Sequence, residues 1–129
     1  MSNPDLNRKS KPWVAVAGPW SQPDPCFNVH RITQLVDEIW SDGICFPICP
    51  MIESHLMQSI CPHTYEKNLE RCMEMMVGSC DAYIYLPGSS SGVREEIRAM
   101  LRHGIPVFSD KESLYAAVLD GTIKKPLSA

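Results

Sequence analysis

Residues 80–97 read CDAYIYLPGSSSGVREEI and contain the pattern of a strand, a loop and the start of a helix. The mainly apolar run over residues 81–86 is typical of a buried strand, and the small residues that follow it are typical of a loop. From Val93 onward, the spacing of apolar residues predicts a helix with carboxylates in its first turn. A loop of glycines and serines at a helix N-terminus presents backbone N–H groups and hydroxyls, which favour anions. The stretch therefore predicts a site for a phosphate or a sugar, with a carboxylate beside it.

The rest of the chain repeats this alternation of strand and helix. Short apolar runs predict further strands over residues 13–17, 44–48 and 105–108. Apolar residues at helical spacing predict four helices, over residues 28–42, 64–77, 93–103 and 110–119, with Asn28, Thr64 and Asp110 as N-caps. Residues 49–63, with Pro50 and Pro62, are predicted to form a long loop that carries function. Because strands alternating with helices form parallel sheets, we predict an α/β fold: a three-layer α/β/α sandwich, Rossmann- or flavodoxin-like, with a doubly wound parallel sheet of roughly four to five strands.

The length of 129 residues fits one domain. We place this domain at residues 12–120, after a leader over residues 1–11 that we expect to be disordered and before a frayed tail over residues 121–129. No run approaches the roughly 18–20 apolar residues that a membrane span needs, and the polar N-terminus is unlike a signal peptide. We therefore expect a cytoplasmic protein without a membrane partner.

Charge and cysteine content exclude further classes. The formal net charge of -3 gives no basic field, so duplex nucleic acid is not expected as a partner. The six cysteines raise the question of zinc, and the possible ligands are Cys45, Cys49, Cys61 and His63. Cys45 and Cys49 lack the C-x-x-C spacing of zinc sites, so we prefer reduced thiols, with Cys72 and Cys80 in the core. We expect neither a metal nor a cofactor.

Helix geometry distinguishes the two adjacent glutamates. Residues advance by about 100° each around a helix, and the apolar face of this one is defined by Val93, Ile97, Met100 and Leu101. Glu95 then points to solvent, whereas Glu96 lies at the flank of the buried face, beside the strand ends where ligands bind in such sheets. Glu96 is therefore the candidate catalytic residue. The alternative is a carboxylate that only stabilises the helix N-terminus.

Several motifs in this order carry a family resemblance. Ala17-Gly18-Pro19 follows the first strand, Cys80-Asp81-Ala82 opens the third, and residues 86–96 read LPGSSSGVREE. Residues 104–107, GIPV, complete the pattern. Over about residues 13–108 the chain resembles the nucleoside 2-deoxyribosyltransferase superfamily, and its small bacterial and phage branches most.

The resemblance implies an activity. Members of this superfamily exchange the base of a deoxynucleoside or release the base from a nucleoside monophosphate, and a glutamate attacks C1′ of the sugar. That glutamate corresponds to Glu96. The residue at Ser90 is an aspartate in the transferases and a serine in the monophosphate hydrolases, so Ser90 implies a 5′-phosphorylated ligand. The candidate substrate-binding residues are Gly18, Pro19, Trp20, Gly88, Ser89, Ser90, Ser91 and Gly92. The resemblance also implies a dimer, for which Met73, Met75 and Met76 are a candidate interface, with core packing as the alternative.

The chain departs from the family at three positions. A tyrosine of the first strand that orients the nucleophile is replaced by Ala15, an aspartate near the leaving base by Met73, and a glycine after the nucleophile by Arg98. These departures favour the alternative of a nucleotide-binding domain without turnover. His55 and His63 could contact the base or only order the predicted loop. A phosphotransfer receiver-like domain shares the layer order, but its acidic pair and its strand-end aspartate are absent here.

Overall fold

A computed structural model of the chain describes residues 10–20, 24–88 and 91–123. The elements follow in the order β1 (Trp13–Ala17), α1 (Pro25–Asp42), β2 (Phe46–Ile48), α2 (Pro50–Ile60), α3 (Tyr65–Ser79), β3 (Ala82–Tyr85), α4 (Ser91–Arg102), β4 (Val107–Phe108) and α5 (Lys111–Leu119). The strands form one four-stranded parallel sheet in the order β2-β1-β3-β4. The predicted α/β sandwich is confirmed.

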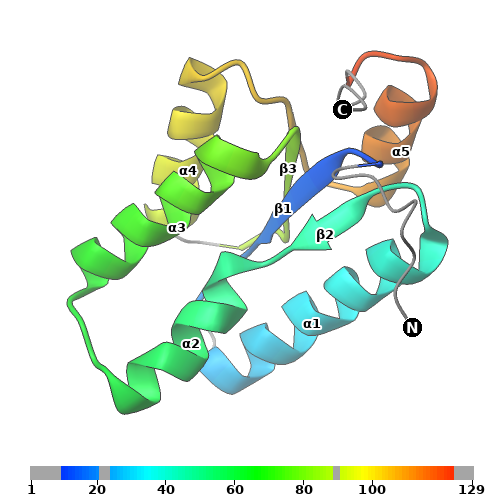
Figure 1. Ribbon diagram of the computed structural model, residues 1–129. Coiled ribbons are helices and arrows are strands. Elements are labelled where there is room, and N and C mark those ends of the chain that lie inside the picture. Colours follow the sequence, from blue (N-terminus) through cyan, green and yellow to red (C-terminus); the bar gives the residue numbers. More distant parts are fainter. Residues whose placement is uncertain (1–9, 21–23, 89–90, 124–129) are drawn as a thin grey trace, which may run out of the picture.

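Helices cover both faces of the sheet, as Figure 1 shows, with α3 and α4 on one side and α1 and α5 on the other. Alternate residues of each strand point to opposite faces, so β1 and β3 contribute to two separate cores. The core beneath α1 and α5 includes Val14, Val16, Ile32, Leu35, Ile39, Ile84, Leu114 and Val118. The core beneath α3 and α4 includes Ala15, Ala17, Cys72, Met76, Cys80, Tyr83, Ala99 and Met100. The predictions that Cys72 and Cys80 are core residues are therefore confirmed.

The register of β1 against β3 shapes the second core. Ala15 is paired with Tyr83 and Ala17 with Tyr85, so each small residue of β1 lies beside a tyrosine of β3. Neighbouring residues in a parallel pair face the same side of the sheet. The alanines therefore leave room beneath α3 and α4 for the large ring of Tyr83, which is fully buried.

Two predicted boundaries were wrong. Residues 50–60 form α2 and not a loop, because Pro50 begins the helix at a position that needs no N–H, and Pro62 follows its end. The sequence of α2 does carry apolar residues at helical spacing, but Leu56, Met57 and Ile60 are exposed in the structure. The two prolines are what make this stretch resemble a loop. Helix α1 begins at Pro25 and is capped by Asp24, whose Oδ1 accepts a hydrogen bond of 2.9 Å from the N–H of Phe27.

The structure also tests predictions that were made for single residues. Asn28, the predicted N-cap of α1, is instead buried within that helix. Ile123, placed in the frayed tail, is only 2% exposed and belongs to the core, so the packed chain extends past residue 120. Met76 is buried and Met73 packs against the same core, which accounts for both without a partner. Asp81 accepts a hydrogen bond of 2.8 Å from the N–H of Trp13, at the edge where the strands begin. Within the described part of the chain, no helix is long and apolar enough to cross a membrane.

Two leucines of α5 test the core. Leu114 is 0% exposed and Leu119 is 76% exposed. We expect Leu114→Ala to lower the free energy of unfolding by about 2–5 kcal/mol, because it opens a cavity in the core. The matched variant Leu119→Ala should change it by less than about 1 kcal/mol. Urea unfolding followed by circular dichroism measures both, and similar losses in the two variants would contradict the packing described.

Candidate functional site

A cavity of about 270 Å³ opens where the carboxyl end of β1 meets the start of α4. In the strand order β2-β1-β3-β4 the chain reverses direction across the sheet between β1 and β3, and open α/β sheets bind ligands at that switch point. The volume is close to the lower limit for small-molecule pockets, so it suits a ligand of modest size. The lining comes from four places in the fold: the end of β1 (Val16, Ala17, Gly18, Trp20), α2 (Pro50, Met51, Ser54, His55, Gln58), the α2–α3 linker with α3 (His63, Asn68, Leu69, Cys72, Met76), and the start of α4 (Gly92, Val93, Glu96).

Helix α4 places Glu96 on this cavity and directs Glu95 to solvent. The face that α4 buries is rotated from the predicted one, because Leu101 is 61% exposed while Ala99 is buried. Val93, Ala99 and Met100 are the buried positions. Glu96 is one turn from each of the three, so it lies near the middle of the inward face and not at its flank.

A tyrosine from the neighbouring strand holds this carboxylate. The hydroxyl of Tyr83 donates a hydrogen bond of 2.8 Å to Glu96 Oε1. Burial raises the pKa of Glu96 to about 7, although the hydrogen bond from Tyr83 opposes that rise by favouring the charged form. Burial and the nearby Glu96 carboxylate raise the pKa of Tyr83, so the phenol keeps its proton and stays a donor. The pair therefore presents a carboxylate that changes charge near neutral pH.

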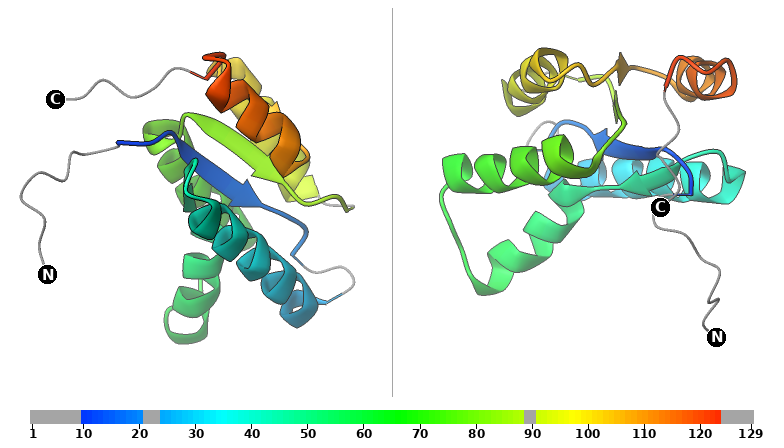
Figure 2. Two further views of the ribbon diagram at one scale, coloured as in Figure 1. Left: turned by 90° about the vertical axis from the view of Figure 1, so that its right-hand side faces the viewer. Right: turned by 45° about the horizontal axis from the view of Figure 1, so that its top comes forward.

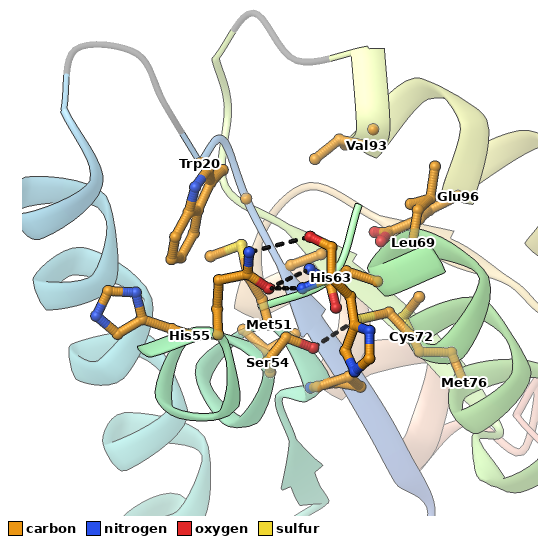
Figure 3. Close-up of a pocket in the computed structure, with 17 residues that line it drawn as sticks. Trp20, Met51, Ser54, His55, His63, Leu69, Cys72, Met76, Val93 and Glu96 are labelled. Carbon is orange, nitrogen blue, oxygen red and sulfur yellow. Dashed lines mark hydrogen bonds between the residues drawn. The ribbon is translucent and has the colours of Figure 1, made fainter. Parts of the chain in front are cut away.

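The aromatic ring of Trp20 and the imidazole of His55 form another wall, seen across the cavity from Glu96 and Val93 in Figure 3. Their ring centroids are 4.9 Å apart in an edge-on contact. The backbone carbonyl of Trp20 accepts a hydrogen bond of 2.8 Å from the side chain of the buried Asn28. This bond ties the loop after β1 to α1, so a flat apolar ring is held in place where it could stack on a base or a sugar.

A polar network joins α2 to α3 at the cavity. The carboxamide of Gln58 binds the backbone of His63 at both ends: Nε2 donates to the carbonyl and Oε1 accepts from the N–H, each at 3.0 Å. Asn68 Nδ2 donates to the same Oε1 at 2.9 Å. Because the backbone groups leave no choice of donor and acceptor, they fix the orientation of the Gln58 side chain and, through it, that of Asn68.

The thiols near the site are inert and hold no metal cluster. Cys72 Sγ lies 3.3 Å from Ser54 Oγ, and burial raises the pKa of Cys72. Burial also raises the pKa of Cys49 to about 12, so neither thiol is a thiolate at neutral pH. All six cysteines are free. Among the residues that the structure describes, no three His, Cys, Asp or Glu side chains gather where they could hold a metal ion.

The predicted site residues fall into three groups. Gly18, Trp20, Gly92 and Glu96 line the cavity. Pro19 and Gly88 pack against each other, and a Cβ at residue 88 would lie 2.6 Å from Pro19 Cγ, so only glycine allows the two loops to approach this closely. Ser89 and Ser90 lie outside the described residues, as does the side chain of Ser91.

Sequence reasoning missed several residues of the site. Ser54, Gln58 and Asn68 face the cavity only because residues 50–60 form a helix that packs beside α3. Tyr83 occurs in an apolar run that predicts nothing more than a buried strand. A buried tyrosine needs a partner for its hydroxyl, and this requirement was the available signal for a polar group nearby.

Comparison with known proteins adds no family assignment. No family model, no curated protein and no solved structure matches the chain significantly. The geometry of the cavity and the motifs of the sequence are therefore the observations on which a function is proposed.

The contribution of Tyr83 can be measured directly. We expect Tyr83→Phe to raise the pKa of Glu96 above its value of about 7 by roughly one, because the carboxylate loses its hydrogen-bond donor. Carbon-13 NMR of the glutamate carboxyls against pH gives this value. Tyr115→Phe is the matched control, since it removes a hydroxyl bonded to Asp42 at 2.7 Å, far from the cavity. An unchanged titration of Glu96 in Tyr83→Phe would contradict the assignment.

The raised pKa of Glu96 also predicts how stability depends on pH. The folded state holds a proton on Glu96 up to about pH 7, whereas the unfolded chain releases it near 4.5. Stability from this group is therefore full below about pH 4.5 and is lost as the pH rises to about 7, by a total of about 2–4 kcal/mol. The neutral variant Glu96→Gln should be more stable than the wild type at pH 8 and similar to it at pH 4.5. Urea unfolding across this range tests it, with Glu95→Gln as control, and a constant difference between Glu96→Gln and the wild type would refute it.

Proposed function

We propose that this protein is an N-glycosidase or deoxyribosyltransferase that cleaves the C1′–N bond of a nucleoside or a nucleoside 5′-monophosphate, with Glu96 as the nucleophile. The observation that carries the proposal is a largely buried carboxylate that lines an open cavity at the switch point of the sheet, with a hydroxyl to orient it. The resemblance of residues 13–108 to the nucleoside 2-deoxyribosyltransferase superfamily supports the same residue in the same role.

A carboxylate in this setting suits the reaction. Cleavage of the C1′–N bond passes through a state with oxocarbenium character, which a negative oxygen stabilises and then captures as a glycosyl ester. Tyr83 holds Glu96 Oε1, so that Oε2 is the oxygen left to attack. Water then releases the sugar in a hydrolase, and a second base does so in a transferase.

Other lining residues have roles in binding. The first turn of α4 reaches the cavity at Gly92, so backbone N–H groups and the helix dipole lie beside the site. We assign the sugar and its 5′ group to this end, with Ser89 and Ser90 preceding α4 in the sequence and Ser91 at its first position, and the base to the side of Trp20 and His55. The described lining holds no lysine or arginine, so a 5′-phosphate would depend on that loop and the helix N-terminus.

The tyrosine that the family carries on its first strand has a counterpart here. Tyr83 on β3 is paired with Ala15 of β1, and its hydroxyl reaches the nucleophile from the neighbouring strand. The departure at Ala15 therefore leaves the nucleophile oriented. The departure at Met73 differs, because this side chain packs into the core and is not part of the described lining.

A binding domain without turnover is the second candidate. Glu96 is the only carboxylate in the described lining, whereas glycosidases use a pair of carboxylates. Such a domain would bind a nucleotide and leave the glycosidic bond intact.

One experiment separates the two functions. The purified protein is incubated with a panel of nucleosides, 2′-deoxynucleosides and their 5′-monophosphates, and released base is measured by chromatography. We expect release that Glu96→Gln lowers by about 1,000-fold or more and that the adjacent exposed variant Glu95→Gln leaves unchanged. Nucleotide binding by calorimetry with no base released would support the binding domain. Equal release by the wild type and Glu96→Gln would remove Glu96 from the mechanism.

A further inference from the structure

The reaction proposed above needs a proton donor for the departing base, and the cavity offers few. In the described lining, the titratable side chains besides Glu96 are His55, His63 and Cys72. Burial raises the pKa of Cys72, so its thiol is a poor acid at neutral pH, and Glu96 is occupied as the nucleophile. Histidine is the side chain whose ordinary pKa lies nearest to neutral, and it is the commonest general acid in enzymes. The donor is therefore to be sought between the two histidines.

The two histidines are held in different ways. The ring of His55 contacts the edge of Trp20, so its place is set by the stacking wall. His63 belongs to the short linker between α2 and α3, and its backbone is held at both the N–H and the carbonyl by Gln58. Within the described chain, neither ring nitrogen of His63 has a hydrogen-bond partner, so the imidazole is available to a ligand. His63 is one of the residues that line the cavity in Figure 3.

Two side chains hold the backbone around His63. Gln58 binds both the N–H and the carbonyl of this one residue, and Asn68 donates a hydrogen bond to the same Gln58 oxygen. Catalytic groups need second residues that lock their position, and loop residues need them most. The backbone of His63 is held by two hydrogen bonds, and its imidazole lies at the cavity. This is the arrangement expected of a general acid that is held in position.

We propose that His63 is the general acid of the site and that Gln58 and Asn68 are its positioning residues. This assignment rests on the proposed function. As a Glu96 oxygen forms its bond to C1′, the C1′–N bond breaks and its electron pair passes to the base. The His63 imidazolium gives its proton to a nitrogen or oxygen of that base, which leaves neutral. The neutral imidazole then takes a proton from water as the water oxygen attacks C1′, which frees the sugar and restores both the Glu96 carboxylate and the imidazolium.

Leaving groups that differ in their need for a proton test the role of His63. A 7-methylguanine base departs neutral without protonation, and 5-fluorouracil is a better leaving group than uracil. We compare guanine with 7-methylguanine, or uracil with 5-fluorouracil, according to the base that the wild type releases. His63→Ala should lower kcat about 100-fold or more for the ordinary base and much less for the activated one. Gln58→Ala should shift the same ratio in the same direction by a smaller factor.

His55→Ala is the matched control, because His55 lines the same cavity but is assigned no proton transfer. His55→Ala should lower kcat/KM for both substrates of a pair by the same factor, mainly by raising KM. Circular dichroism confirms that each variant is folded. Equal losses on ordinary and activated bases in His63→Ala would show that His63 is structural and would overturn the assignment. Failure of the wild type to release any base would overturn the proposed function itself, and the general acid with it.

Discussion

The hydrogen bond from Tyr83 to Glu96 is the contact on which the site depends. Packing of α4 against the sheet takes the Glu96 carboxylate largely out of water. The hydrogen bond of 2.8 Å from the Tyr83 hydroxyl compensates for part of the lost hydration. Without burial, the pKa of this carboxyl group would not be raised, and Glu96 would be an ordinary surface charge. Without the hydroxyl, it would be held protonated over a wider range of pH. The balance of the two effects leaves a carboxylate that ionises near pH 7.

This contact exists because of the order of the strands. Parallel pairing places Tyr83 beside Ala15, and the small residues of β1 open the space that the tyrosine ring fills. The same pairing puts the end of β1 next to the start of α4, and the cavity forms between them. One feature of the sheet therefore brings together the Glu96 carboxylate, the hydroxyl bonded to it and the space for a ligand.

Helices α2 and α3 complete the site from the side. Figures 1 and 2 show their linker at the periphery, away from the sheet, yet side chains of both helices reach the cavity. Hydrogen bonds of Gln58 and Asn68 close the linker around His63 and make this outer wall polar, whereas the inner walls are mostly apolar. A ligand with an apolar or aromatic part and a polar edge matches this division, and a nucleoside has both.

The sequence by itself determined the α/β class, the parallel sheet and the choice of Glu96 over Glu95, because period-two and period-3.6 apolar patterns are local properties of a chain. It did not determine α2, whose prolines resemble those of a loop and whose apolar residues Leu56, Met57 and Ile60 are largely exposed. It also did not indicate that Tyr83 bonds to Glu96 or that Gln58 braces His63. Those contacts depend on strand register and on the packing of one helix beside another. They join residues whose proximity no local pattern encodes, so they could be seen only in the folded chain.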